Sequence, residues 1–173
     1  MTTVNPNHAE FKTQDAASYN PVAQSFDRFV TQLSAPVAAR LVALAGLAPD
    51  NHVLDVGAGT GIVALRAVAE MGPSGRVVGI DLSDGMLEVA RQNARGRGLA
   101  DRVEFRKMDA ESLDCKDGSF DAVVSLFALR HFPHPETALQ EMHRVLRPGG
   151  RLVLAVGSGA PWLSLVGLVH RLK

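Results

Sequence analysis

Glycines and acidic residues stand where they could bind a nucleotide-like ligand. The glycines lie in Gly57-Ala58-Gly59-Thr60-Gly61, directly after the apolar run His52–Val56 and before a helical pattern. Glycine lets a backbone turn sharply and lets a ligand approach without a Cβ in the way. A helix that begins there presents unpaired N–H groups and a partial positive charge. The segment is a candidate binding loop, although many kinds of nucleotide-binding protein use a loop of this type.

The spacing of these glycines distinguishes between two kinds of ligand. The dinucleotide fingerprint needs glycine at its first, third and sixth positions, and the sixth position counted from Gly57 is Ile62. Asp55, which stands two residues before Gly57, would repel a pyrophosphate and would attract a ligand that carries an ammonium and a sulfonium group. A dinucleotide-dependent oxidoreductase is therefore kept only as a less favoured alternative.

Two further acids follow the next two apolar runs. Asp81 directly follows the run Arg76–Ile80. A carboxylate at that place could accept hydrogen bonds from ribose hydroxyls. Asp109 follows the run Arg102–Lys107, where it could accept a bond from an exocyclic amine. Each acid alone could be a helix cap or a solvated loop residue, and Ser83 has the residue type of a helix cap. Together the three acids match an adenosine with a cationic amino-acid tail.

The expected elements place these residues at one edge of a sheet. Apolar strands that alternate with helices indicate a parallel sheet covered on both faces, and such sheets bind ligands beyond the carboxyl ends of their strands. The predicted fold class is α/β, a Rossmann-like three-layer αβα sandwich with a mostly parallel sheet. Strands are expected at His52–Val56, Arg76–Ile80, Arg102–Lys107, Phe120–Leu126 and Arg151–Val156, and helices at Ile62–Met71, Asp84–Arg97 and Pro135–Leu146.

The two ends of the chain are expected to add helices to this core. The polar stretch up to about Gln14 is expected to fray, and Pro21–Gly46 to form two helices, the second from Pro36 to Ala45. The apolar stretch Pro161–Leu172 is expected to form one helix. The predicted division is an N-terminal segment and helical lid over 1–47, a ligand-binding core over 48–160 and a truncated C-terminal helix over 161–173.

Composition narrows the functional classes. The 173 residues suit one domain, and 18 basic residues balance 18 acidic ones, so a nucleic-acid partner is not expected. The single cysteine, Cys115, excludes an internal disulfide and suits a reducing, cytoplasmic location. No apolar stretch reaches the length of a membrane span. His131 and His134 stand three apart without an evident third ligand, so no metal is expected.

The motifs taken together resemble a known family. The first, Val53–Gly61, is similar to the first signature of the class I S-adenosylmethionine-dependent methyltransferases, and four more follow in the order of that family. They are Gly79–Ser83, Met108–Glu111, Phe120–Ser125 and Leu146–Leu152. The resemblance covers roughly residues 48–156 and is nearest to the ubiquinone and menaquinone C-methyltransferases. It implies that S-adenosylmethionine is the cofactor and S-adenosylhomocysteine the product.

The resemblance also implies a role for each binding residue. The loop residues would pack against the methionine part, with Asp55 near its amino group and Ser125 lining that end. Asp81 would bind both ribose hydroxyls, and Tyr19 would belong to a lid. The adenine would lie between Leu82 and Met108, with Asp109 on its amine and the Ala110 N–H on a ring nitrogen. The implied cofactor-binding set is Tyr19, Asp55, Gly57, Ala58, Gly59, Gly61, Asp81, Leu82, Met108, Asp109, Ala110 and Ser125.

The expected activity is methyl transfer to a small-molecule acceptor by in-line displacement. His131, just past the fourth strand, is a candidate general base, and Tyr19 is the other candidate catalytic residue. A non-catalytic S-adenosylmethionine-binding module remains an alternative, and the acceptor atom can be carbon, oxygen or nitrogen. Relatives continue past the fifth strand with further strands, which this chain is expected to lack. An exposed sheet edge, and a homodimer formed through it, are therefore expected.

Overall fold

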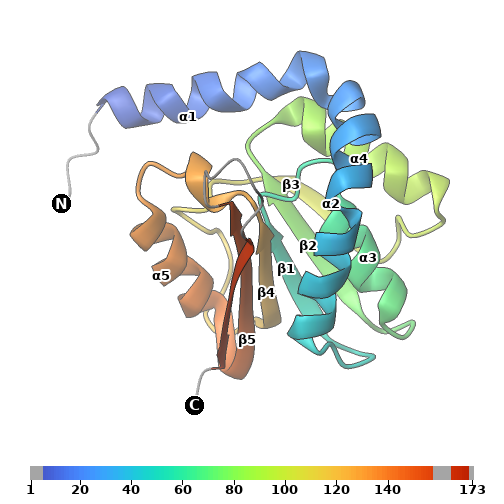
Figure 1. Cartoon of the computed structure of the whole chain (residues 1–173). Coiled ribbons are helices and arrows are strands. Elements are labelled where there is room, and N and C mark those ends of the chain that lie inside the picture. Colours follow the sequence, from blue (N-terminus) through green and yellow to red (C-terminus); the bar gives the residue numbers. More distant parts are fainter. Residues whose placement is uncertain (1–5, 158–164, 172–173) are drawn as a thin grey trace.

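A six-stranded sheet forms the middle layer of the protein (Figure 1). The computed structural model describes residues 6–157 and 165–171. The strand order is β3-β2-β1-β4-β5-β6, in which the first five strands are parallel and β6 is antiparallel to β5. The strands are β1 (His52–Val56), β2 (Arg76–Asp81), β3 (Val103–Lys107), β4 (Phe120–Leu126), β5 (Leu146–Gly157) and β6 (Leu165–Arg171).

Helices cover both faces of this sheet (Figure 1). Three of them, α2, α3 and α4, pack on one face, and α5 packs on the other. Helix α1 extends across one end of the molecule (Figure 1). The helices are α1 (Pro6–Tyr19), α2 (Ala23–Ala45), α3 (Ile62–Glu70), α4 (Asp84–Gly96) and α5 (Pro135–Val145), with short 3-10 turns η1 (Asn20–Val22) and η2 (Leu129–His131). The layers and the parallel strands confirm the predicted fold class.

The central strand β1 shows why its sequence is almost wholly apolar. Val53 packs into the cluster on the side of α2, α3 and α4, whereas Leu54 and Val56 pack into the cluster on the side of α5. Alternate side chains of a strand point to opposite faces, so a strand covered on both faces needs apolar residues at successive positions. Asp55 is the exception in this strand, and it is 1% exposed.

Two local signals fix helix ends close to where the sequence predicts them. The Ser83 hydroxyl accepts a hydrogen bond from the Met86 N–H at 3.2 Å and caps α4. Gly46 adopts a left-handed conformation (φ +56°) and ends α2, which is a conformation that glycine takes without steric cost. Both signals involve residues close to one another in the sequence, so they can be recognised without knowledge of the tertiary structure.

The N-terminal part of the prediction is wrong in two places. Residues 6–14 of the stretch expected to fray belong to α1, and one helix, α2, with Pro36 inside it, stands in place of the two helices expected between Pro21 and Gly46. Helix α1 is fixed by polar contacts to loops of the core, for example from Lys12 to Asp109, so apolar periodicity does not reveal it. Pro36 lacks an N–H, but the packing of α2 on the sheet outweighs the loss of one helical bond.

The expected C-terminal helix over 161–173 is also wrong for the residues of that range that the structure describes, 165–171. Residues Leu165–Arg171 form β6, which pairs with β5 in an antiparallel register from Arg151↔Arg171 to Gly157↔Leu165. An unpaired β5 would present a row of free backbone N–H and C=O groups, and pairing with β6 satisfies those on one side. The expected bare edge at β5 is therefore absent, residues 161–164 lie outside the described part, and homodimer formation stays a prediction.

Among residues 6–157 and 165–171, no helix combines the length and the apolar character that crossing a bilayer requires.

Candidate active site

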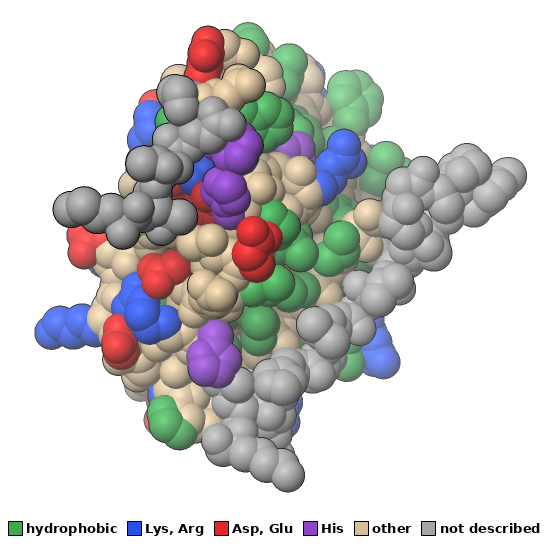
Figure 2. Space-filling model, turned by 90° about the vertical axis from the view of Figure 1, so that its left-hand side faces the viewer, with side chains coloured by type: hydrophobic (Ala, Val, Ile, Leu, Met, Phe, Trp, Pro, Cys, Tyr) green, Lys and Arg blue, Asp and Glu red, His purple; other side chains and the backbone are tan. Residues whose placement is uncertain are grey.

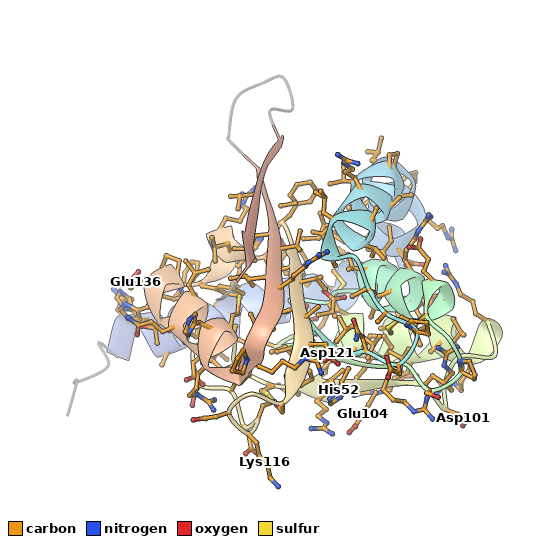
Figure 3. The ribbon with its side chains drawn as sticks, turned by 90° about the horizontal axis from the view of Figure 1, so that it is seen from below. His52, Asp101, Glu104, Lys116, Asp121 and Glu136 are labelled. Atoms are coloured by element: carbon orange, nitrogen blue, oxygen red, sulfur yellow. The ribbon has the colours of Figure 1, made fainter. Side chains whose placement is uncertain are left out.

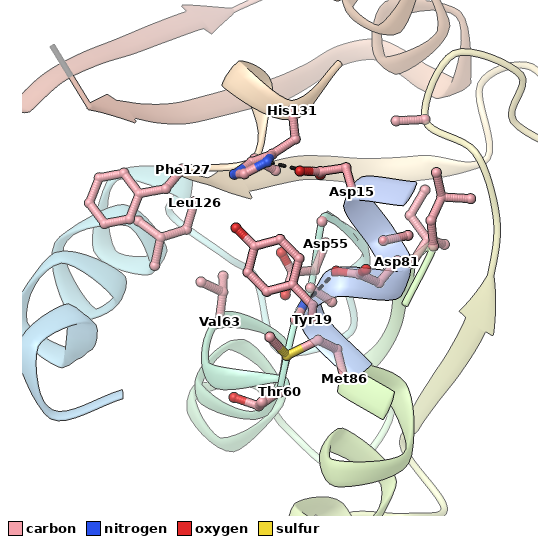
Figure 4. Close-up of a pocket in the computed structure, with 18 of the residues that line it drawn as sticks. Asp15, Tyr19, Asp55, Thr60, Val63, Asp81, Met86, Leu126, Phe127 and His131 are labelled. Carbon is pink, nitrogen blue, oxygen red and sulfur yellow. Dashed lines mark hydrogen bonds and ion pairs between the residues drawn. The ribbon is translucent and has the colours of Figure 1, made fainter. Parts of the chain in front are cut away.

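A pocket opens at the carboxyl ends of β1, β2 and β4, beneath α1 (Figure 4). Its volume is about 1140 Å³, with its open mouth included. Most of the residues predicted for the site line it, although they come from separate parts of the chain. Those that line it are Tyr19, Asp55, Gly57, Ala58, Gly59, Asp81, Leu82, Met108, Asp109, Ala110 and His131.

Two predicted residues lie behind the wall of this pocket. Gly61 precedes α3 with φ +90°, and a Cβ there would lie 2.9 Å from Cζ of Phe105. Ser125 is 2% exposed, and its hydroxyl donates to the Val56 carbonyl at 2.7 Å. Neither residue is among those that line the pocket. Gly61 is needed for close packing between the loop and the core, and Ser125 joins β4 to β1.

The glycine loop is held in place by the second strand. The N–H groups of Gly57 and Ala58 both donate to the Ile80 carbonyl, at 2.9 and 2.8 Å. The Gly59 N–H donates to Oδ2 of Asp81 at 2.9 Å. Gly59 has φ +54°, and a Cβ built there would meet nothing within 4 Å. The loop therefore presents open space on the pocket side at Gly59, which a ligand can fill.

Asp55 brings an incompletely paired carboxylate to the pocket. Its Oδ2 accepts a hydrogen bond from the Ala64 N–H at 2.9 Å, while its buried Oδ1 has no hydrogen-bond partner among the described residues. Burial raises the pKa of Asp55 to about 7; the Ala64 N–H opposes this rise and the nearby charge of Asp81 adds to it. A cation placed at Oδ1 would stabilise the charged form and satisfy the free oxygen.

Asp81 has a different environment at the end of β2. Its Oδ1 accepts from the Ser83 N–H and its Oδ2 from the Gly59 N–H, both at 2.9 Å. Burial raises the pKa of Asp81, and the N–H groups of Ser83, Gly59 and Leu82 oppose that rise. Each carboxylate oxygen keeps a second lone pair, so Asp81 can still accept bonds from two hydroxyls of a ligand.

Lys12, which the sequence analysis did not identify, closes the end of the pocket near Asp109. Its Nζ donates to Oδ2 of Asp109 at 2.7 Å and to Oε2 of Glu111 at 2.6 Å. The Glu111 N–H donates to Oδ1 of Asp109 at 2.9 Å, so both oxygens of Asp109 are engaged. Burial alone would lower the pKa of Lys12, but its bonds to Asp109 and Glu111 outweigh burial and raise it.

Helix α1 contributes one of its faces to the pocket. Lys12, Asp15, Ala16 and Tyr19 line the cavity and have helical spacing, so they lie on the same side of the helix. Tyr19, predicted as part of a lid, is the last residue of α1. The signal for this face is a spacing of polar and aromatic residues, which a search for apolar periodicity overlooks.

His131 lies at the pocket between Asp15 and Tyr19 (Figure 4). Its Nδ1 is 3.1 Å from Oδ2 of Asp15, and its ring packs edge-on against the Tyr19 ring with centroids 5.7 Å apart. His134 lies elsewhere, with its Nε2 2.8 Å from Nδ1 of His8. Figure 2 shows histidine side chains close to acidic ones on this side of the molecule. Of the two predicted histidines, only His131 lines the pocket.

Apolar side chains also line the pocket. Phe26 and Val30 come from α2, Leu126 ends β4, and Phe127 and Phe132 follow that strand in the same segment as His131. Phe127 has φ +61°, an uncommon conformation for a residue with a large side chain. Its N–H donates to the Ala155 carbonyl at 2.8 Å, which holds this turn against β5. Phe127 and Phe132 follow the end of β4, and this place in the sequence is the signal that could have predicted them as pocket residues.

Asp121 lies at the opposite end of the sheet, as its place at a strand start indicates. The His52 N–H donates to its Oδ2 at 2.6 Å, and its Oδ1 pairs with Arg147. The view from below shows Asp121 beside His52, at the end of the strands away from the pocket (Figure 3). Asp121 therefore joins strands β1, β4 and β5 at their starts and has no place in the site.

Comparison with known proteins assigns the family. The model of the family described as "Methyltransferase domain" matches residues 54–154, which is more than half of the chain. The chain belongs to this family. The matched region contains the glycine loop and the strand ends that form the pocket.

Individual relatives agree with this assignment. The chain is 42% identical over 127 residues to a ubiquinone/menaquinone biosynthesis C-methyltransferase of Ectopseudomonas mendocina, an alignment that covers 72% of this chain and 50% of the relative. The chain thus spans about half the length of the curated relatives it matches. A putative methyltransferase from Bacillus halodurans is similar in structure, with a TM-score of 0.64 and 37% identity over 72% of this chain and 52% of that one. A SAM-dependent methyltransferase from Aquifex aeolicus has a TM-score of 0.66 and 25% identity, covering 72% of this chain and 66% of that one.

S-adenosylmethionine is the cofactor that this family membership assigns, and the pocket fits it. The free buried oxygen of Asp55 suits the cationic amino group, and the open space at Gly59 admits a ligand beside the backbone. Asp81 retains acceptor capacity for hydroxyls, while Leu82 and Met108 supply apolar side chains at the far end. The carboxylates of Asp55 and Asp81 beside the glycine loop would repel a pyrophosphate, which disfavours a dinucleotide.

Proposed function

We propose that the protein transfers a methyl group from S-adenosylmethionine to a ring carbon of a hydroquinone-type small molecule. The observation that carries the proposal is one pocket with two kinds of lining. The carboxylates of Asp55 and Asp81 line it together with His131 and with apolar side chains such as Leu126 and Phe127. The C-methyltransferases that the chain resembles act, by their name, in ubiquinone and menaquinone biosynthesis, and this supports a quinone-related acceptor.

In this proposal the acids orient the cofactor along the ends of the strands. Asp55 binds the amino group, Asp81 binds the two ribose hydroxyls, and Gly59 provides the space for close approach. Leu82 and Met108 hold the adenine between them, and Asp109 and the Ala110 N–H bind its polar edge. Asp109 Oδ2, which accepts from Lys12, also accepts from the adenine amine when the cofactor is bound. With the cofactor held in this way, Asp55 and the glycine loop would direct its methionine end towards the apolar side chains of the lining.

The apolar side chains of the lining suit a flat, uncharged ring. They come from α2, from the end of β4 and from the segment after it, so the faces of an acceptor ring can be buried against them. Burial also excludes water, and alignment of the acceptor carbon with the methyl group is the main contribution that the protein must make. Phe127 and Phe132 are the aromatic residues proposed to stack against the acceptor.

The chemical step needs little from the protein besides positioning and one proton acceptor. When bound, S-adenosylmethionine supplies an electrophilic methyl: the acceptor carbon forms a C–CH₃ bond, the S–CH₃ bond breaks, and its electron pair converts the sulfonium to a thioether. The ring carbon then loses its proton to restore the aromatic hydroquinone. We assign that proton to His131, which lines the same pocket.

Two measurements on the intact chain test this function. Calorimetric titration with S-adenosylhomocysteine tests the cofactor site, and transfer of tritium-labelled methyl to naphthohydroquinone tests the reaction. His131→Gln should retain binding and reduce turnover about 100-fold, whereas the exposed His143→Gln on α5 should change neither. Binding without transfer to any acceptor would favour a non-catalytic module, and NADH binding in place of S-adenosylhomocysteine would revive the oxidoreductase alternative.

A further inference from the structure

We propose that Asp15 of α1 is a positioning residue for His131, so that the proton acceptor is oriented only when α1 lies across the pocket. This inference rests on the proposed function, because that function requires His131 to accept a proton. Its basis is geometric: Oδ2 of Asp15 lies 3.1 Å from Nδ1 of His131, and both residues line the pocket. They are far apart in the sequence, with a separation of 116 positions.

The contact determines which ring nitrogen is basic. A carboxylate accepts hydrogen bonds, so Asp15 selects the His131 tautomer that carries its proton on Nδ1. The lone pair is then on Nε2, on the side of the ring away from Asp15 (Figure 4). A histidine oriented in this way by a carboxylate can take a proton through its other nitrogen, and the carboxylate stabilises the cation that forms.

The rest of α1 reinforces this orientation. Tyr19, one helical turn after Asp15, packs edge-on against the His131 ring at an interplanar angle of 80°. His131 itself is the last residue of the short 3-10 turn η2, so it does not lie within a long helix or a strand. The histidine therefore receives two side-chain contacts from α1, one on its nitrogen and one on its ring. A displaced α1 would remove both contacts together.

Helix α1 is anchored at points other than this histidine. Lys12 is paired with Asp109 and Glu111 one turn before Asp15, and Asn20 just after the helix accepts from the Ser83 hydroxyl at 2.8 Å. These anchors lie at the part of the site proposed for the adenosine. Occupancy of the cofactor site and orientation of the proton acceptor are thus connected through one helix.

The direct test reads the tautomer of His131 and needs no methyl acceptor. In the full chain labelled with ¹⁵N-histidine, long-range ¹H–¹⁵N correlation at about pH 8.5, where histidine is generally neutral, distinguishes Nδ1–H from Nε2–H. The His131→Gln spectrum identifies the signal among the six histidines. We expect the Nδ1–H form in the unaltered chain and a shift towards Nε2–H in Asp15→Ala. The Nε2–H form in the unaltered chain, or no change in Asp15→Ala, overturns the proposal.

Kinetics provide the second readout and separate this inference from the proposed function. With naphthohydroquinone, Asp15→Ala should lower kcat at least about tenfold, because an orienting carboxylate is lost, while S-adenosylhomocysteine affinity stays within about twofold. Asp15→Glu should recover part of kcat. Glu10→Gln, an exposed acid on the same helix, should leave kcat unchanged. If the unaltered chain does not methylate the probe, the proposed reaction fails, and the tautomer experiment still decides the role of Asp15.

Discussion

Asp81 and Gly59 are joined by a hydrogen bond of 2.9 Å, from the Gly59 N–H to Oδ2 of the carboxylate. The bond connects the end of β2 to the glycine loop that follows β1. The acid proposed to bind the ribose therefore also fixes the loop proposed to contact the methionine part. Because the two functions share one side chain, a change at Asp81 should affect both ends of the cofactor.

Replacement of Asp81 should weaken cofactor binding more than it weakens the fold. Asp81→Asn keeps the shape of the side chain but removes the charge that strengthens its bonds to hydroxyls, each worth about 1.5–3 kcal/mol. We expect S-adenosylhomocysteine affinity to fall at least about tenfold in calorimetric titration. Asp84→Asn, at an exposed acid paired with Lys107 outside the pocket, is the control and should bind normally. Equal affinities for both variants would contradict the role of Asp81.

Gly59 and Gly98 form a matched pair that separates backbone strain from ligand contact. Both have positive φ, +54° and +66°, and a Cβ built at either would meet nothing within 4 Å. Alanine should cost about 1–2 kcal/mol of stability at each, because both lie in the left-handed region. Only the methyl of Gly59→Ala would enter the space proposed for the cofactor, so only that variant should lose S-adenosylhomocysteine binding. The two should give similar melting temperatures, and loss of binding in Gly98→Ala would show that strain alone explains the effect.

The sequence predicted the core of the fold because the relevant signals are local. The apolar runs of β1 and β4 have the predicted bounds, since strands covered on both faces are apolar throughout. Ser83 caps α4 as its residue type indicates. The three acids at strand ends were also predictable, because the carboxyl ends of parallel strands converge at one edge of the sheet.

What the sequence did not predict depends on contacts between distant segments. Helix α1 has no apolar periodicity and is fixed by pairs such as Lys12 with Asp109, so the helix and its pocket residues other than Tyr19 were not predicted. Strand β6 forms against β5, although the segment has the composition of an apolar helix. Ser125 was assigned to the pocket by resemblance, but its hydroxyl binds the Val56 carbonyl inside the sheet.

Lys12 should control how firmly α1 is held. Lys12→Ala removes its bonds to Asp109 and Glu111, and Glu111 is left with little exposure to water. Partly exposed pairs of this kind are worth about 1 kcal/mol, so amide hydrogen exchange in α1 should become roughly fivefold faster while exchange in β1 and β4 stays the same. Arg66→Ala removes an exposed pair with Glu70 on α3 and should leave α1 unchanged. Unaltered exchange in α1 of Lys12→Ala would show that other contacts hold the helix.

Asp55 should make the unliganded protein less stable as the pH rises. Its pKa is raised by burial from the ordinary value of 3.8 to about 7. Between these values the folded chain binds a proton that the unfolded chain has lost, so the free energy of unfolding falls with increasing pH, by up to about 1.4 kcal/mol per unit for one group. Urea unfolding between pH 5 and pH 8 should show this slope, and Asp55→Asn, which cannot ionise, should lack the part due to Asp55.

The cofactor should reverse part of this pH dependence. An ammonium placed at the free Oδ1 of Asp55 favours the charged carboxylate, so S-adenosylhomocysteine should bind more tightly as the pH rises towards about 7 and then level off. The Asp55→Asn variant provides the comparison, because its amide oxygen can still accept from the Ala64 N–H while its charge is absent. Parallel affinity profiles for the two proteins would show that the amino group does not lie at Asp55, and would place it elsewhere along the glycine loop.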